Sequence, residues 1–104
     1  MQWTFPMQPE EQSDVILRLR TAKGHLEGVI GMAERGESCE QVLHQLGAVQ
    51  SALRVAGARL LACQVKRSEG VILYSACPED RAAELTRISD LYFQLIKYSD
   101  LDGR

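Results

Sequence analysis

The chain has 104 residues, 45% of them hydrophobic, and a formal net charge of −2 at pH 7. This length and composition predict one small globular domain rather than a disordered or fibrous protein. The nearly balanced charge excludes a general electrostatic attraction to nucleic acid. The charge is nevertheless uneven, because residues 17–25 contain Arg18, Arg20 and Lys23 without an acidic residue.

Targeting signals and cysteine usage bear on the compartment. The first residues lack the basic start and apolar run of a signal peptide. No stretch reaches the roughly 18 apolar residues that span a bilayer. We therefore expect a cytoplasmic protein without a membrane partner. Three cysteines, an odd number, indicate free thiols rather than a disulfide framework.

A tail and a long amphipathic helix are expected at the start of the chain. Residues 1–12 predict a flexible tail, and the helix that follows begins near Ser13 and ends just before Gly36. Gly24, Gly28 and Gly31 lower the helix propensity by roughly 1 kcal/mol each, which indicates that another helix approaches closely there.

The second predicted helix begins with a cysteine. Ser38 followed three residues later by Gln41 is a capping-box signature, so Cys39 is expected at the first position of a helix. This helix should end between Ser68 and Ala76. The positive end of a helix dipole favours a thiolate over a thiol. The position of Cys39 thus suggests a sensor of metals or of thiol-reactive chemicals.

A third helix completes the expected fold. It begins at Pro78 with Cys77 as the N-cap and ends near Tyr98, so that one domain covers residues 13–98 and a tail covers residues 99–104. Three helices without a strand pattern predict an all-α fold. A second helix of about 30 residues is too long for two shorter helices to cover. Its apolar stripe therefore predicts an antiparallel helical-bundle dimer.

Three sequence patterns together resemble a known family. They are R-L-x-x-x-x-G-[Q/H]-x-x-G at residues 18–28, a single Cys39, and V-L-x-Q-L-x-A-V-x-x-A-L at residues 42–53, followed by a paired leucine at residues 60–61. This combination resembles the CsoR/RcnR family of small all-helical bacterial repressors. The resemblance implies a disc-shaped homotetramer that binds operator DNA and releases it when an effector binds.

The resemblance also implies an effector site, which this chain fills incompletely. Copper-sensing members use the Cys that begins the second helix, with a His and a Cys further along that helix in the partner chain. Here Cys39 matches, whereas Gln64 and Ser68 occupy the other two positions, and Glu84 matches a glutamate behind the ligands. Gln and Ser are poor ligands for Cu(I). We therefore expect a reactive sulfur species, an oxidant or an electrophile at Cys39 rather than Cu(I). Zn²⁺ held with outside ligands remains an alternative.

The other thiols and the histidines have two interpretations each. Cys63 is either a core residue or a resolving thiol for Cys39 of a partner subunit. Cys77 is either an ordinary cap or a third redox or metal-binding thiol. His25 either contacts DNA or a subunit interface, or is solvated. His44 lies about 140° from Cys39 on an ideal helix, which argues against a shared ligand face.

The basic residues of the first helix form a candidate DNA contact. Arg18, Arg20 and Lys23 form either a phosphate-binding patch or a solvated helix face, and the family resemblance places Arg18 at a DNA-contacting position. Arg54 and Arg59 on the second helix extend the candidate set. With so few basic residues, DNA affinity should be modest and sensitive to salt.

The predicted function is transcriptional repression, relieved when a thiol-reactive or metal effector engages Cys39. The alternative is a helical interaction or thiol-carrier module that does not bind DNA. An enzyme is not expected, because the sequence contains no acid/base pair, nucleophile triad or phosphate-binding loop.

Overall fold

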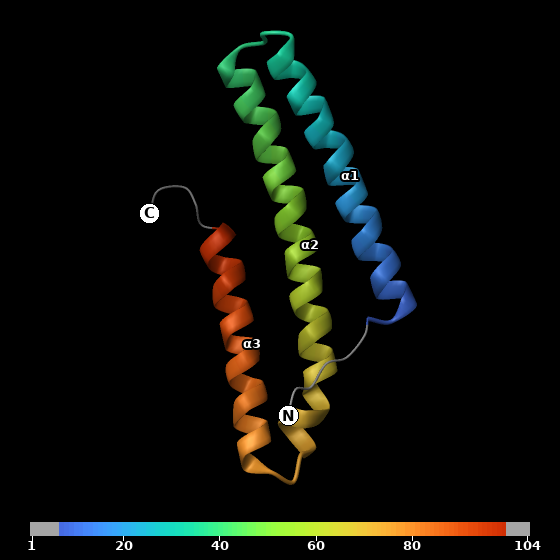
Figure 1. Cartoon of the computed structure of the whole chain (residues 1–104), viewed down its shortest axis with the longest axis vertical. Helices are drawn as coiled ribbons and strands as arrows, with labels where there is room; N and C mark the ends of the chain where they lie inside the picture. Colours follow the sequence, from blue (N-terminus) through green and yellow to red (C-terminus); the bar gives the residue numbers. More distant parts are fainter. Residues whose placement is uncertain (1–6, 100–104) are drawn as a thin grey trace. The chain divides into compact units, whose positions relative to one another are not determined.

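The computed structural model describes residues 7–99, which form three α-helices and no β-strand. α1 spans Pro9–Glu34, α2 spans Cys39–Tyr74 and α3 spans Pro78–Ser99 (Figure 1). The predicted all-α class is confirmed. Within these residues, no helix combines the length and hydropathy that would be needed to cross a membrane.

The start of α1 differs from the prediction. The helix begins at Pro9 rather than near Ser13, so residues 9–12 are helical and not part of a tail. Proline suits the first helical position, because its missing N–H needs no partner there. Glu10 and Glu11 in the first turn also interact favourably with the positive end of the helix dipole. The predicted tail residues 1–6 lie outside the described part of the chain.

Contacts divide the chain into two compact units, and α2 contributes to both. The first hairpin, Pro9–Ala56, contains α1 and the first part of α2. The second hairpin contains the rest of α2 and α3, which are residues 57–99, together with residues 7 and 8. α2 is long enough that the two shorter helices pack along different stretches of it.

The core of the first hairpin is a narrow seam. Val15, Ala22 and Val29 are buried on α1, and Val49 and Ala56 are buried on α2. Successive members lie seven residues apart, which keeps them on one side of a helix. A seam of this kind covers only one stripe of each helix, so many leucines stay outside it.

The turn between α1 and α2 requires a glycine. Gly36 has φ of +77°, a conformation that side chains with a Cβ rarely adopt. Its N–H donates to the carbonyl of Ala33 at 3.0 Å, and the N–H of Glu37 donates to the carbonyl of Met32 at 3.1 Å. These two bonds form a Schellman motif, so Gly36 ends the helix as the sequence predicts.

The close helix approach occurs at a different glycine from those expected. A Cβ placed on Gly24 or Gly28 would meet nothing within 4 Å, and one on Gly31 would meet the nearby Arg35 side chain and no other helix, so the predicted approach is wrong for contacts within this chain. A Cβ on Gly57 would lie 2.8 Å from Cδ1 of Leu95, which shows that α3 packs against α2 at this point. Buried positions of the second hairpin include Cys63 and Val71.

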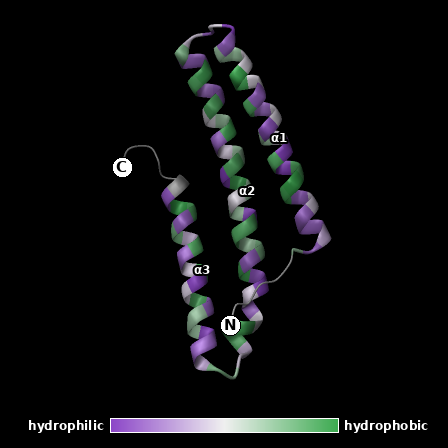
Figure 2. Cartoon of the chain, viewed as in Figure 1, coloured by the Kyte–Doolittle hydropathy of each residue, from purple (hydrophilic) through white to green (hydrophobic). Residues whose placement is uncertain are grey.

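Large apolar side chains remain exposed on all three helices. Figure 2 shows hydrophobic residues recurring along each helix rather than confined to one element. Leu43 is 68% exposed, Phe93 is 66% exposed and Tyr74 is 81% exposed. Such surface is unusual for a small soluble monomer and is typical of a chain that packs against other protein surface.

Candidate functional site

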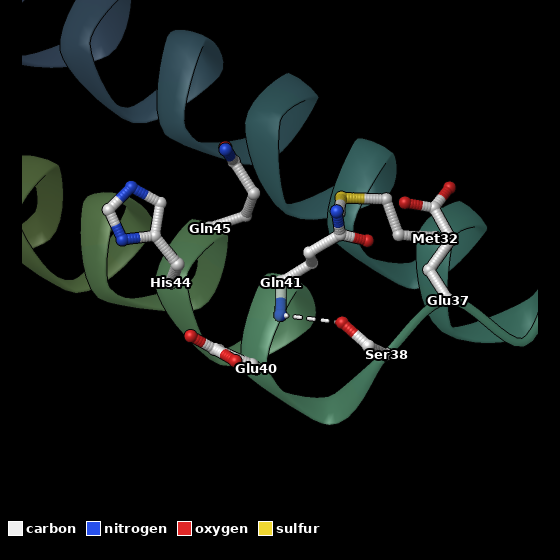
Figure 3. A pocket seen from close by; sticks show the side chains of 7 residues that line it. All are labelled: Met32, Glu37, Ser38, Glu40, Gln41, His44 and Gln45. Atoms are coloured by element: carbon white, nitrogen blue, oxygen red, sulfur yellow. Dashed lines mark hydrogen bonds between the residues drawn. The ribbon is translucent and has the colours of Figure 1, made fainter.

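Cys39 is the first residue of α2 and is exposed. Ser38 caps the helix, because its Oγ accepts a hydrogen bond from the backbone N–H of Gln41 at 3.2 Å (Figure 3). Among the described residues, the Gln41 side chain makes no return bond to Ser38, so only half of the predicted capping box forms. The structure therefore confirms the predicted helix start and places the thiol of Cys39 within reach of solvent.

A pocket of about 570 Å³ lies between the end of α1 and the start of α2 (Figure 3). Its lining side chains are mostly polar, and Cys39 is not among them although both of its sequence neighbours are. The lining residues are Met32, Glu37, Ser38, Glu40, Gln41, His44 and Gln45. The lining contains two carboxylates, those of Glu37 and Glu40, and the Glu37 carboxylate forms an ion pair with Arg35 at 2.8 Å.

Sequence reasoning did not find this pocket. Met32 and Glu37 flank the turn, and no motif distinguishes them from ordinary turn residues. His44 was considered only as a ligand alongside Cys39, whereas in the structure it lines the pocket. The sequence does indicate that residues on either side of a helix–helix turn lie close together in space. This closeness is the feature that could have suggested a pocket here.

His25 has a partner within the chain. Its Nε2 atom lies 2.9 Å from Oε1 of Gln45, so the imidazole links α1 to α2 in the first hairpin. An Oε1 atom only accepts hydrogen bonds, and Nε2 therefore donates in this arrangement. His25 is therefore bonded within the chain rather than simply solvated, and its contact with DNA or a subunit interface stays a prediction.

A buried polar network lies in the second hairpin. Ser68 is fully buried, and Glu84 is 2% exposed. Ser68 Oγ donates to Glu84 Oε1 at 2.7 Å and accepts from Gln64 Nε2 at 3.0 Å. Arg87 donates to the same Glu84 oxygen through Nε at 3.1 Å and through one terminal nitrogen at 2.7 Å. The structure thus brings together three of the predicted site residues, Gln64, Ser68 and Glu84.

Arg87 completes this network and was missed from the sequence. A buried carboxylate is costly unless it is paired with a cation and hydrogen-bonded, and Arg87 satisfies both needs for Glu84. The two residues are three positions apart on α3, a spacing that brings side chains together on a helix. This spacing permits an ion pair between Glu84 and Arg87, but it does not show that Glu84 is buried.

The other two cysteines occupy contrasting environments. Cys63 is 7% exposed in the second hairpin. Cys77 is exposed before α3, and its carbonyl accepts the N–H of Arg81, as expected for an N-cap residue. The Cys77 thiol donates to Glu79 Oε2 at 3.1 Å. This hydrogen bond, followed by one from the backbone N–H of Glu79, lowers the pKa of the Glu79 carboxyl.

The predicted DNA-contacting residues are distributed over both hairpins. Arg20 and Lys23 are exposed, whereas Arg18 is partly buried and forms an ion pair with Asp14 at 3.1 Å. Arg54 donates to Ser51 Oγ at 2.9 Å. Arg59 belongs to the second hairpin and is exposed.

The sequence as a whole matches one protein family. Residues 11–91 match the model of the family described as metal-sensitive transcriptional repressor. This chain belongs to that family. The family is one of transcriptional repressors, which are not enzymes.

Curated relatives agree with this membership over a shorter stretch. The copper-sensing transcriptional repressor CsoR of Mycobacterium ulcerans is 50% identical over 44 residues, which cover 42% of this chain and 38% of that protein. CsoR of Mycobacterium tuberculosis strain H37Rv is 43% identical over 44 residues, covering 42% of this chain and 37% of that protein. The matched stretch therefore spans less than half of either relative.

A solved structure supports the fold. A single-residue variant of the formaldehyde-responsive regulator FrmR from Salmonella enterica serovar Typhimurium has a TM-score of 0.69 to this chain at 23% identity. The match covers 86% of this chain and 99% of that one. At this identity the similarity establishes the shared fold.

The residues of this family member do not fit a Cu(I) site of the usual kind. Within residues 7–99, no group of three or more His, Cys, Asp or Glu side chains is placed to hold a metal ion. Gln64 and Ser68, at the positions where the resemblance implies His and Cys, are hydrogen-bonded to each other, and Ser68 is also bonded to Glu84. Cu(I) prefers thiolate and imidazole ligands, which these side chains do not offer. Cys39 is the one matching soft ligand.

Proposed function

We propose that this protein is a DNA-binding transcriptional repressor that leaves its operator when a thiol-reactive or metal effector engages Cys39. Family membership supports the repressor role. The observation that carries the sensing role is the exposure of Cys39 at the first residue of α2. An exposed thiol is accessible to reagents from solvent, which a sensor of thiol-reactive chemicals requires.

The proposed effector is a reactive sulfur species, an oxidant or an electrophile. Such reagents need one accessible thiol, and Cys39 provides it. A persulfide on Cys39 is the product expected from a reactive sulfur donor. Gln64, Ser68 and Glu84 would act as a structural network rather than as metal ligands, with Cys63 buried in the same hairpin. Zn²⁺ bound to Cys39 with outside ligands is the metal alternative.

The proposed DNA contact uses basic side chains and phosphates. Arg20 and Lys23 are supported by their exposure on α1, and Arg18, Arg54 and Arg59 complete the proposed set. Few charges are involved, so affinity should be modest and should fall as salt rises. A protein with this role works where the chromosome is, which in bacteria is the cytoplasm.

The proposed assembly is an antiparallel dimer that pairs into a homotetramer. It is supported by the exposed apolar side chains of all three helices, which include Leu43, Tyr74 and Phe93. Burying them against a second copy removes apolar surface from water and favours association. Light scattering coupled to size-exclusion chromatography should give a mass of four chains.

The decisive experiment measures DNA binding by fluorescence anisotropy. Reduced protein is titrated onto a labelled duplex from the region upstream of its own gene. Cu(I), Zn²⁺, a polysulfide and formaldehyde are then added separately. The variant Cys39→Ala tests the sensor, and Cys77→Ala is the matched control, because Cys77 is also an exposed thiol at the start of a helix.

Each outcome has a defined meaning. We expect one effector to release DNA from the native protein and from Cys77→Ala, but not from Cys39→Ala. Release that persists without Cys39 would contradict the sensor role. Absence of DNA binding by the reduced protein at low salt would contradict the repressor role.

A further inference from the structure

Arg18 differs from the other two basic residues of α1. Its Nε atom donates to both carboxylate oxygens of Asp14, at 3.2 and 3.1 Å. The two side chains are 35% and 39% exposed, so the pair lies at the surface, partly covered. Arg20 and Lys23 are exposed and, among the described residues, neither forms an ion pair or a side-chain hydrogen bond.

Helix geometry separates these basic residues into two groups. At about 100° per residue, Arg20 and Lys23 lie roughly 60° apart on α1, whereas Arg18 lies roughly 140–160° from both. Asp14 is four residues before Arg18 and therefore only about 40° from it around the helix. The carboxylate is thus placed to act on Arg18 and not on the other two.

We propose that Asp14 competes with DNA phosphate for Arg18 and so holds the DNA affinity of the protein down. This inference rests on the proposed repressor function. A carboxylate and a phosphate use the same donor edges of a guanidinium group, so Arg18 Nε cannot serve both at once. Phosphate binding at the Nε edge of Arg18 requires the Asp14 pair to open, and the carboxylate beside it also repels a phosphate that approaches the terminal nitrogens.

The expected effect is moderate, because an exposed ion pair is weak and is screened by salt. Asp14→Asn keeps the size of the side chain and removes its charge. We expect this variant to bind DNA about 2–5-fold more tightly at low salt than the native protein. The logarithmic salt slope should steepen by about 0.9 if Arg18 neutralises one additional phosphate.

The test compares five main proteins, and a sixth as a check, by anisotropy over a series of salt concentrations. They are the native protein, Asp14→Asn, Arg18→Ala, the double variant of these two, and Glu34→Gln as the charge control. Glu34 is exposed near the other end of the same helix. It lies about 30 Å along α1 from Asp14, about three times the screening length of about 10 Å at 0.1 M salt. Circular dichroism establishes that each variant keeps its helices, and Asp14→Ala serves as a second charge-removing variant.

The outcomes distinguish this inference from the proposed function. Tighter binding by Asp14→Asn that disappears in the Arg18→Ala background, with no gain in Glu34→Gln, supports the competition. Equal binding by Asp14→Asn and the native protein overturns it, as does a gain that persists without Arg18 or appears equally in Glu34→Gln. If neither the native protein nor Asp14→Asn binds DNA at low salt, the repressor function itself fails, and the inference fails with it.

Discussion

The two hairpins differ in how far they expose the side chains of the candidate site. The first leaves Cys39 exposed, with Ser38 as the helix cap, and contains the polar pocket. The second closes Ser68 and Glu84 away from water in a network with Arg87. The difference separates the exposed thiol of Cys39 from the buried polar network; the other exposed thiol, Cys77, lies in the second hairpin, outside that network. In the second hairpin, Gln64 and Ser68 occupy the positions where the resemblance implies metal ligands. These two side chains are hydrogen-bonded to each other instead.

The largest expected effect is in thiol reactivity. In the folded, reduced protein, iodoacetamide should modify Cys39 and Cys77 faster than Cys63 by on the order of 100-fold or more. Reaction at Cys63 requires the second hairpin to open, and local opening of a packed element costs several kcal/mol. Mass spectrometry of digested samples over time measures the three rates. Equal rates at Cys39 and Cys63 would show that the second hairpin is not closed.

A second experiment tests the interpretation of Cys63 as a resolving thiol. A disulfide between Cys39 and Cys63 of a partner subunit would appear as a covalent dimer on a non-reducing gel after diamide treatment. The variant Cys77→Ala removes the other exposed thiol, so any remaining dimer must involve Cys39 or Cys63. Absence of a dimer in that variant would exclude the resolving role.

The next effect is on stability, through the buried ion pair. Arg87→Ala should lower the free energy of unfolding by about 2 kcal/mol. Breaking a fully buried pair costs about 3–5 kcal/mol, and the smaller value reflects the partial exposure of Arg87. Urea denaturation followed by circular dichroism gives this difference. Arg81→Ala, which removes an exposed arginine on the same helix, is the control and should change stability by less than about 0.5 kcal/mol.

The variant Glu84→Gln, which removes the buried charge, tests whether the loss of stability in Arg87→Ala comes from the ion pair. In the background of Glu84→Gln, Arg87→Ala should cost clearly less than in the native protein, because no buried charge is left unpaired. An equal cost in both backgrounds would mean that Arg87 stabilises α3 by packing and not by pairing with Glu84.

A smaller loss is expected at the helix cap of the first hairpin. Ser38→Ala removes the acceptor for the Gln41 N–H and should lower the free energy of unfolding by about 1 kcal/mol. Ser38→Asp keeps an oxygen acceptor and should retain most of the stability. Ser51→Ala is the control, because that hydroxyl is exposed and does not cap a helix. A loss in Ser51→Ala as large as that in Ser38→Ala would argue against the capping role.

The smallest effect concerns the turn before α3. The hydrogen bond from the Cys77 thiol holds the pKa of Glu79 below the usual range of a glutamate. NMR titration of the Glu79 carboxyl should show this, and Cys77→Ala should move the pKa back up. Because the folded pKa is lowered, the stabilising contribution is present above the unfolded pKa and is lost as the pH falls through the lowered value. An unchanged pKa in Cys77→Ala would assign the shift to the backbone N–H alone.

The helix boundaries show how far local sequence reasoning extends. The start of α2 at Cys39, the end of α1 before Gly36 and the start of α3 at Pro78 follow from caps and backbone conformations that involve only a few neighbouring residues. The start of α1 was misplaced, because Pro9 reads equally well as a tail residue or as a first helical residue. Only the packing of the rest of the helix distinguishes the two.

The candidate site was predictable in its residue types but not in its contacts. The sequence identifies Cys39 as a helix-start thiol and Gln64 and Ser68 as unsuitable Cu(I) ligands. It does not identify Arg87 as the partner of Glu84, Gln45 as the partner of His25 or Asp14 as the partner of Arg18. The spacings permit these pairs, but several other pairs have the same spacing.

The sequence by itself determined the all-α class, most of the helix ends and the membership in a repressor family, because these depend on short-range backbone chemistry and on a pattern of residue types. The tertiary structure alone decided that Gly57 rather than Gly24 or Gly28 meets another helix, and that Ser68 and Glu84 are buried together. These facts depend on which faces of the helices meet. That choice is made by the packing of many side chains at once, so no short stretch of sequence contains it.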